Sequence, residues 1–143
     1  MSAVWRLSFA LFCIALSGCA STSGANADLT GSAGFACGLD DGPATLAHLQ
    51  AKAASMIWVV NVQGRSPDQL NGAYPINDQR QTASLRVCDD ALDCKVALEG
   101  SIVVIGVHPR RVDGVLSYRL PDGASERLTF SAAIEKPRDA ICP

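Results

Sequence analysis

The chain has 143 residues, of which 48% are apolar, and a formal net charge of −2. This length suits a single domain with one modest core, and this apolar fraction excludes wholesale disorder. The 12 basic residues are scattered and are outnumbered by 14 acidic ones. We therefore expect no nucleic-acid partner.

Residues 1–18 have the pattern of a signal peptide. Arg6 is the single positive residue of a short n-region, and residues 7–16 form an apolar stretch as long as an h-region. That stretch is too short to cross about 30 Å of hydrocarbon as a helix. Loss of Arg6 with the signal would leave 11 basic residues against 14 acidic ones, a charge of −3.

Directly behind the apolar stretch comes Leu16-Ser17-Gly18-Cys19. This tetrapeptide resembles the lipobox of bacterial lipoproteins, which has an aliphatic residue, two small residues and a cysteine. The resemblance implies that Cys19 receives a thioether-linked diacylglycerol, that cleavage precedes it, and that its new amino group is acylated. Stable anchoring requires about two acyl chains, because each buried methylene contributes about 0.8 kcal/mol. The alternatives are an ordinary secretory signal cleaved elsewhere and a short buried helix.

The residues after the lipobox predict a location and a tether. In Gram-negative lipoproteins an Asp after the cysteine favours retention in the inner membrane. By that resemblance, Ala20 favours the outer membrane, with the protein facing the periplasm. Residues 20–34 are small and polar, which is typical of a flexible coil. We therefore predict a signal peptide over 1–18, a lipidated cysteine and tether over 19–34, and a folded domain over 35–143.

Four cysteines remain outside the signal peptide and the lipobox: Cys37, Cys88, Cys94 and Cys142. An even number in an exported chain predicts two disulfides, for which three connectivities exist. We favour Cys88–Cys94, which closes a short loop, and Cys37–Cys142, which joins the two ends of the folded unit. The competing interpretation is a metal site or a redox pair. The spacing of Cys88 and Cys94 fits neither the Cys-x-x-Cys of thiol oxidoreductases nor a zinc ribbon.

Residues 44–54 are the ambiguous segment of the domain. They have high helix propensity, and Asp41-Gly42-Pro43 could start a helix. We favour a short helix here over a strand.

From Ser55 onward the pattern predicts β-structure. Val96 and Leu98 alternate with polar or small neighbours, and residues 102–105 are either buried on both faces or kinked at the preceding Gly100. The predicted strands before the last hairpin lie at residues 56–62, 74–76 (a short edge segment inside the long connection 65–81), 83–87, 96–98 and 102–105.

The last predicted hairpin turns at Pro121-Asp122-Gly123. A loop of three or five residues would place the apolar sets of its two strands on one face, whereas a two-residue loop would place them on opposite faces. We therefore predict an odd-length loop, with Tyr118 opposite Leu128 and Leu116 opposite Phe130.

These patterns predict a mainly β fold, a small antiparallel β-sandwich or barrel-like domain. The region between Cys37 and Cys142 is also similar to a diffuse class of small, uncharacterised bacterial envelope lipoproteins. The similarity is carried by Cys88, Cys94, the carboxy-terminal Cys142, the strand over 114–120, Asp122-Gly123 and Phe130. It implies a β-rich fold and no particular activity.

No catalytic motif is present. The sequence contains no Gly-x-Ser-x-Gly elbow, no phosphate-binding loop and no dinucleotide fingerprint. His48 lies in the ambiguous segment and His108 in a predicted turn, and isolated histidines of this kind are more often solvated than catalytic. We expect no metal and no cofactor.

Three smaller features have a functional and a structural interpretation. Asp89, Asp90 and Asp93 could hold calcium, but the glycine and the terminal glutamate of an EF-hand are missing, so we predict a solvated acidic loop. The Arg110-Arg111 pair could meet an anionic head group, although such pairs are more often simply exposed. Trp58 is predicted to be a core residue rather than a stacking platform.

Together these observations predict a non-enzymatic outer-membrane lipoprotein. It would bind a protein or another envelope component such as a polysaccharide. The alternative is a periplasmic inhibitor or small ligand-binding module that acts through one loop, either 65–81 or 88–94. A third possibility is an enzyme with an unrecognised site.

Overall fold

The computed structural model describes residues 27–38, 42–51, 55–76 and 81–135. These residues form nine strands and one 3-10 turn. In chain order the elements are β1 (Leu29–Cys37), β2 (Pro43–Ala51), β3 (Ile57–Gln63), η1 (Pro67–Gln69), β4 (Gly72–Ile76), β5 (Ala83–Cys88), β6 (Cys94–Val96), β7 (Glu99–His108), β8 (Arg111–Arg119) and β9 (Ser125–Ile134).

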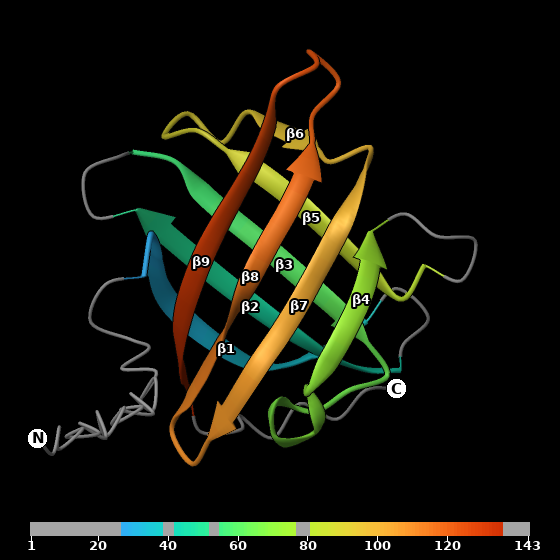
Figure 1. Ribbon diagram of the computed structural model, residues 1–143, viewed down its shortest axis with the longest axis vertical. Coiled ribbons are helices and arrows are strands. Elements are labelled where there is room, and N and C mark those ends of the chain that lie inside the picture. Colours follow the sequence, from blue (N-terminus) through green and yellow to red (C-terminus); the bar gives the residue numbers. More distant parts are fainter. Residues whose placement is uncertain (1–26, 39–41, 52–54, 77–80, 136–143) are drawn as a thin grey trace, which may run out of the picture.

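Eight of these strands close into a barrel (Figure 1). The strand order is β3-β2-β1-β9-β8-β7-β4-β5, and pairing of β3 with β5 completes the circle. The ninth strand, β6, pairs with β5 alone. The mainly β prediction and its barrel-like alternative are therefore confirmed. The sheet is mixed rather than purely antiparallel, because β1–β9 and β4–β5 are parallel pairs.

The barrel interior is the hydrophobic core. Along β3, β5 and β8 every second side chain is buried, as expected for a sheet with one face turned inward. Trp58 is only 5% exposed, which confirms its prediction as a core residue. The largest fully buried side chains come from strands all around the barrel: Leu29, Leu49, Leu85, Ile102, Leu116 and Val112.

A bend at Leu98 lets one stretch of chain pair with two sets of neighbouring strands. β6 runs along the edge of β5, and after Leu98 the chain continues as β7, which includes Gly100, between β8 and β4. Gly100 has a φ of +145°, and a Cβ there would lie 2.0 Å from the carbonyl oxygen of Ser117. Gly100 lies within β7, paired with Tyr118 and with Ile76, and the kink expected at this glycine stays a prediction. Burial of residues 102–105 on both faces is wrong, since Ile105 is 67% exposed.

The segment expected to be helical is a strand. β2 pairs with β1 over its whole length and with β3 over residues 44–50. Thr45, Ala47 and Leu49 point into the core, while His48 and Gln50 are exposed. Pairing on both edges overrides a helix propensity worth a few tenths of a kcal/mol per residue. Residues 52–54 lie outside the described residues.

Part of the expected tether also belongs to the barrel, since residues 29–34 form most of β1. Their small side chains permit a close approach to β2: a Cβ on Gly31 would lie 1.9 Å from the carbonyl oxygen of His48. Just before the strand, the Asp28 carboxylate accepts hydrogen bonds from the backbone N–H of Thr129 at 2.8 Å and from its hydroxyl at 2.9 Å. These hydrogen bonds join the start of β1 to β9.

The β8–β9 hairpin has the odd-length loop that was predicted. Arg119 pairs with Ser125, which leaves five residues, 120–124, in the loop. Gly123 takes a φ of +87°, a conformation that favours glycine.

The expected partners across this hairpin were wrong by two residues. Leu128 pairs with Leu116 rather than with Tyr118, and Phe130 pairs with Gly114. A shift of two keeps every side chain on its face, so alternation cannot distinguish the two registers. The observed one leaves room for the ring of Phe130, since a Cβ on Gly114 would lie 2.5 Å from it.

Candidate functional site

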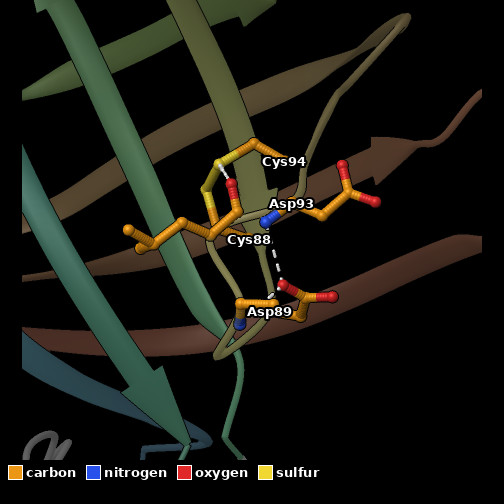
Figure 2. The surroundings of a disulfide bond; sticks show 6 residues. Cys88, Asp89, Asp93 and Cys94 are labelled. Atoms are coloured by element: carbon orange, nitrogen blue, oxygen red, sulfur yellow. Dashed lines mark hydrogen bonds between the residues drawn. A yellow bond between two sulfur atoms is a disulfide. The ribbon is translucent and has the colours of Figure 1, made fainter.

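A disulfide between Cys88 and Cys94 closes the connection between β5 and β6, as predicted (Figure 2). The two residues face each other across the hairpin with their Cα atoms 4.0 Å apart. The connection lies at the same end of the barrel as the β8–β9 turn, whereas the β7–β8 turn lies at the opposite end (Figure 1). The second predicted bridge, Cys37–Cys142, includes a residue outside the described residues and stays a prediction.

The five residues 89–93 between the two cysteines are here called the disulfide loop. The carboxylate of Asp89 holds the backbone of this loop in place. Oδ1 of Asp89 accepts hydrogen bonds from the backbone N–H groups of Ala91 at 3.0 Å and of Asp93 at 2.9 Å. Figure 2 shows this carboxylate turned toward the Asp93 nitrogen. Leu92 adopts a left-handed φ of 63°. Asp89 therefore has a structural role in the acidic loop.

Large apolar side chains are exposed around the disulfide loop. Leu92 is 76% exposed, Leu98 52%, Val96 48% and Met56 38%. We call these four residues the Leu92 face. The sequence shows Val96 and Leu98 alternating with smaller or polar residues. In the structure these two side chains face solvent, and Ala97 between them is buried. The exposure of Leu92 was not predicted.

Beneath this end of the barrel, three side chains from three strands form a hydrogen-bonded chain. The indole N–H of Trp58 donates to the hydroxyl of Tyr118 at 2.7 Å, and that hydroxyl donates to the carboxylate of Glu126 at 2.6 Å. Burial, with the hydrogen bond to Glu126, raises the pKa of the Tyr118 hydroxyl. Because these bonds connect side chains of β3, β8 and β9, they hold these three strands together beneath the disulfide loop.

An ion pair connects β6 to the β8–β9 turn on the outside. The ammonium of Lys95 lies 2.7 Å from the carboxylate of Asp122, and both groups are exposed. Asp122 also accepts a hydrogen bond from the backbone N–H of Ala124 at 3.0 Å. The hydrogen bond to Asp122 raises the pKa of Lys95, and the same bond lowers the pKa of Asp122. The charge of Lys95 is therefore paired within the protein with that of Asp122.

The two histidines lie on different elements. His48 is exposed on the outer side of β2, and His108 ends β7. Nε2 of His108 lies 3.3 Å from Oδ2 of Asp113, and Nε of Arg111 donates to the same oxygen at 3.0 Å. No group of three His, Cys, Asp or Glu side chains in the described ranges could hold a metal ion. Of the Arg110-Arg111 pair, Arg110 is exposed and Arg111 is half-buried.

At the end of the barrel opposite the disulfide loop, a surface groove of about 460 Å³ lies beside His108. Two carboxylates, of Asp68 and Glu135, accompany its apolar lining. The other lining residues are Phe35, Pro67, Val107, Pro109 and Ile134.

The interior of the barrel is filled by side chains. Among the described residues, an interior cavity of about 20 Å³ has an apolar lining that includes Leu49, Ile102 and Phe130. This volume would hold about one water molecule. An eight-stranded barrel can be filled or can enclose one small ligand, and this one is filled.

The predicted lipidation site, Cys19, lies outside the described residues. Within the part of the chain that the structure covers, no helix is long and apolar enough to cross a membrane. No protein-family model, no curated protein and no solved structure matches this chain. The geometry of the barrel and the amino-terminal sequence are therefore the observations from which its function is argued.

Proposed function

We propose that this protein is a non-enzymatic outer-membrane lipoprotein, anchored by lipid on Cys19, whose barrel binds a protein or another envelope component through its outer surface. The lipobox, Leu16-Ser17-Gly18-Cys19, is the observation that carries the proposal. It combines an aliphatic residue, two small residues and a thiol directly behind an apolar stretch, and a thiol is the group that a thioether-linked lipid requires.

The length of the tether limits how far the barrel can move from the membrane. Asp28 is fastened to β9, so that only residues 20–27 separate it from Cys19. Eight residues extend to at most about 30 Å, because each spans about 3.3–3.6 Å. A flexible chain of that length has an average span of about 16 Å. A partner in the same membrane, or close to it, would therefore be within reach.

The filled interior favours an outer-surface interaction over a ligand carried inside the barrel. A drug-sized ligand occupies a pocket of about 300–1,000 Å³. The interior cavity of about 20 Å³ is far below that range. A ligand inside would have to displace core side chains such as Leu49 and Ile102, whose exposure is 0% and 1%.

The disulfide loop supports a second candidate, a periplasmic inhibitor that acts through one loop. A loop fixed by a covalent bridge and by the Asp89 carboxylate loses little conformational freedom on binding. The exposed side chain of Leu92 at this loop could enter a pocket of the inhibited protein. The other loop proposed for such a role, 65–81, contains no cysteine and therefore no such bridge.

The test is fractionation of a Gram-negative bacterium that expresses the full chain. We expect the wild type and a Cys13→Ala control in the outer-membrane fraction, because Cys13 precedes the lipobox. A Cys19→Ala variant should appear in the soluble periplasmic fraction. A soluble wild-type protein, or a Cys19→Ala variant that stays in the membrane, would contradict the proposal.

A further inference from the structure

We propose that the Leu92 face is a docking surface for a protein partner that offers an apolar pocket bordered by lysine and arginine side chains. This inference rests on the proposed function and specifies which part of the barrel surface binds and what chemistry it binds.

The first argument is where exposed apolar side chains gather. Among the described residues, five large apolar side chains are conspicuously exposed, and four of them are Met56, Leu92, Val96 and Leu98. The fifth, Ile105, lies on β7 away from them. A single exposed apolar side chain is ordinary on a protein surface, but a group of them marks an interaction site.

Strand register brings these four residues to one end of the barrel. Ile57 pairs with Cys88, so Met56 directly precedes the strand position beside the disulfide. Val96 lies on β6 two residues beyond Cys94, on the same side of the strand. Leu98 follows the end of β6, and its backbone N–H donates at 2.8 Å to the carbonyl of Arg119, the residue of β8 next to the β8–β9 turn. Figure 1 shows β6 and its connection to β5 at this end.

The second argument is the rigidity of the loop that presents Leu92. The bridge between Cys88 and Cys94, the two hydrogen bonds to Asp89 and a backbone bond from Leu92 N–H to the Asp89 carbonyl at 3.1 Å fix its shape. Below it, Trp58 is bonded to Tyr118. A surface already in its binding conformation pays less entropy when it docks.

The third argument is charge, which selects the partner. The disulfide loop carries three carboxylates, of Asp89, Asp90 and Asp93, and contains no lysine or arginine. Lys95 beside it is paired with Asp122 at 2.7 Å, and Arg86 on β5 is the remaining cation of this hairpin. The loop that carries Leu92 is thus negatively charged, although Arg86 lies opposite Val96, and a basic surface complements this loop.

The same charge argues against two other occupants. A second copy of this chain, docked loop to loop, would bring six carboxylates together. An anionic lipid surface would likewise be repelled by the acidic loop.

The test is site-specific photo-crosslinking with the full, lipidated chain in the membranes of a bacterium to which the protein is native. A benzophenone side chain replaces Leu92 in one variant and Ile105 in a matched control, since these two residues are similarly exposed. We expect a discrete protein adduct from position 92 alone, and a crosslinked peptide of net positive charge when its sequence is read by mass spectrometry. An Asp90→Asn/Asp93→Asn double variant, which leaves Asp89 and the loop hydrogen bonds intact, should lower the adduct yield about fivefold or more.

No adduct at position 92, an adduct with lipid or with a second copy, an acidic partner peptide, or a yield unchanged by the double variant would overturn the inference. Failure of this inference differs from failure of the proposed function. If the protein is membrane-bound and crosslinks from position 105 but not from 92, the docking face is wrong while the function stands. If the protein is absent from the membrane, the proposed function itself fails.

Discussion

Replacing Tyr118 by phenylalanine removes one hydroxyl from the hydrogen-bonded chain below the disulfide loop and leaves the ring in place. The indole N–H of Trp58, a side chain only 5% exposed, then loses its acceptor. The carboxylate of Glu126 loses a donor at 2.6 Å, but Glu126 is exposed and water can replace that donor. The cost of the substitution should therefore arise mainly at Trp58.

The magnitude follows from these two terms. A buried donor left without an acceptor costs about 1–3 kcal/mol, and a hydrogen bond to a charged group contributes about 1.5–3 kcal/mol when water does not replace it. Because water does replace it at Glu126, we expect Tyr118→Phe to lower the free energy of unfolding by about 1–3 kcal/mol. Glu126→Gln keeps an oxygen acceptor for Tyr118 and should cost less than about 1 kcal/mol.

Urea unfolding of the soluble Cys19→Ala form, followed by tryptophan fluorescence, measures both variants. The midpoint should fall for Tyr118→Phe with little change in the slope of the transition, because the ring still packs in the core. A cost below about 0.5 kcal/mol, or a Glu126→Gln cost as large as that of Tyr118→Phe, would refute the reasoning.

The same tyrosine predicts a pH dependence. Its pKa in the folded protein is raised by burial and by Glu126, whereas in the unfolded chain it takes its ordinary value of about 10. The unfolded chain therefore releases this proton first, and stability that is fully present below about pH 10 is lost as the pH rises further. The Tyr118→Phe variant should lack this part of the alkaline decline.

Three further predictions concern other parts of the barrel. Gly114→Ala should cost about 1–3 kcal/mol of unfolding free energy in urea, because its Cβ would lie 2.3 Å from the carbonyl oxygen of Val103 and 2.5 Å from the ring of Phe130. Gly42→Ala, with nothing within 4 Å of the added Cβ, should change it by less than about 0.5 kcal/mol. A Cys88→Ser/Cys94→Ser variant should lose about 2 kcal/mol in the same assay, the loop-entropy value for so short a loop, and an unchanged midpoint would show that the bridge contributes nothing. The pKa of Asp28 is lowered mainly by a backbone hydrogen bond, so its stabilising effect is present above its ordinary pKa and lost as the pH falls through the folded value. Asp28→Asn should reduce the acid dependence of the melting temperature, and identical acid profiles would contradict this role.

Much of the fold was predictable because alternation of apolar residues follows directly from a sheet with one buried face. Trp58 and the strand ending at Cys88 were placed correctly on that basis. The strand over β2 was not, because its alanine-rich sequence satisfies helix propensity, while its strand conformation comes from pairing with β1 and β3, which directly precede and follow it. Local sequence does not contain that pairing.

The candidate site was predictable only in part. The spacing of Cys88 and Cys94 indicated the short disulfide, and the structure contains it. The hydrogen bond between Tyr118 and Glu126 was not foreseen, because it depends on a hairpin register that side-chain alternation leaves ambiguous by two residues. The exposure of Val96 was also not foreseen. In this alternating segment the small residue Ala97 is buried, while the larger apolar residues Val96 and Leu98 face solvent.

The central claim is that this barrel is held to a membrane through the sulfur of one cysteine. Intact-mass measurement of the protein extracted from membranes tests it most directly. We predict a polypeptide that begins at Cys19 and carries the added mass of two or three acyl chains. A chain that retains residues 1–18, or one that begins elsewhere and bears no lipid, would contradict the claim.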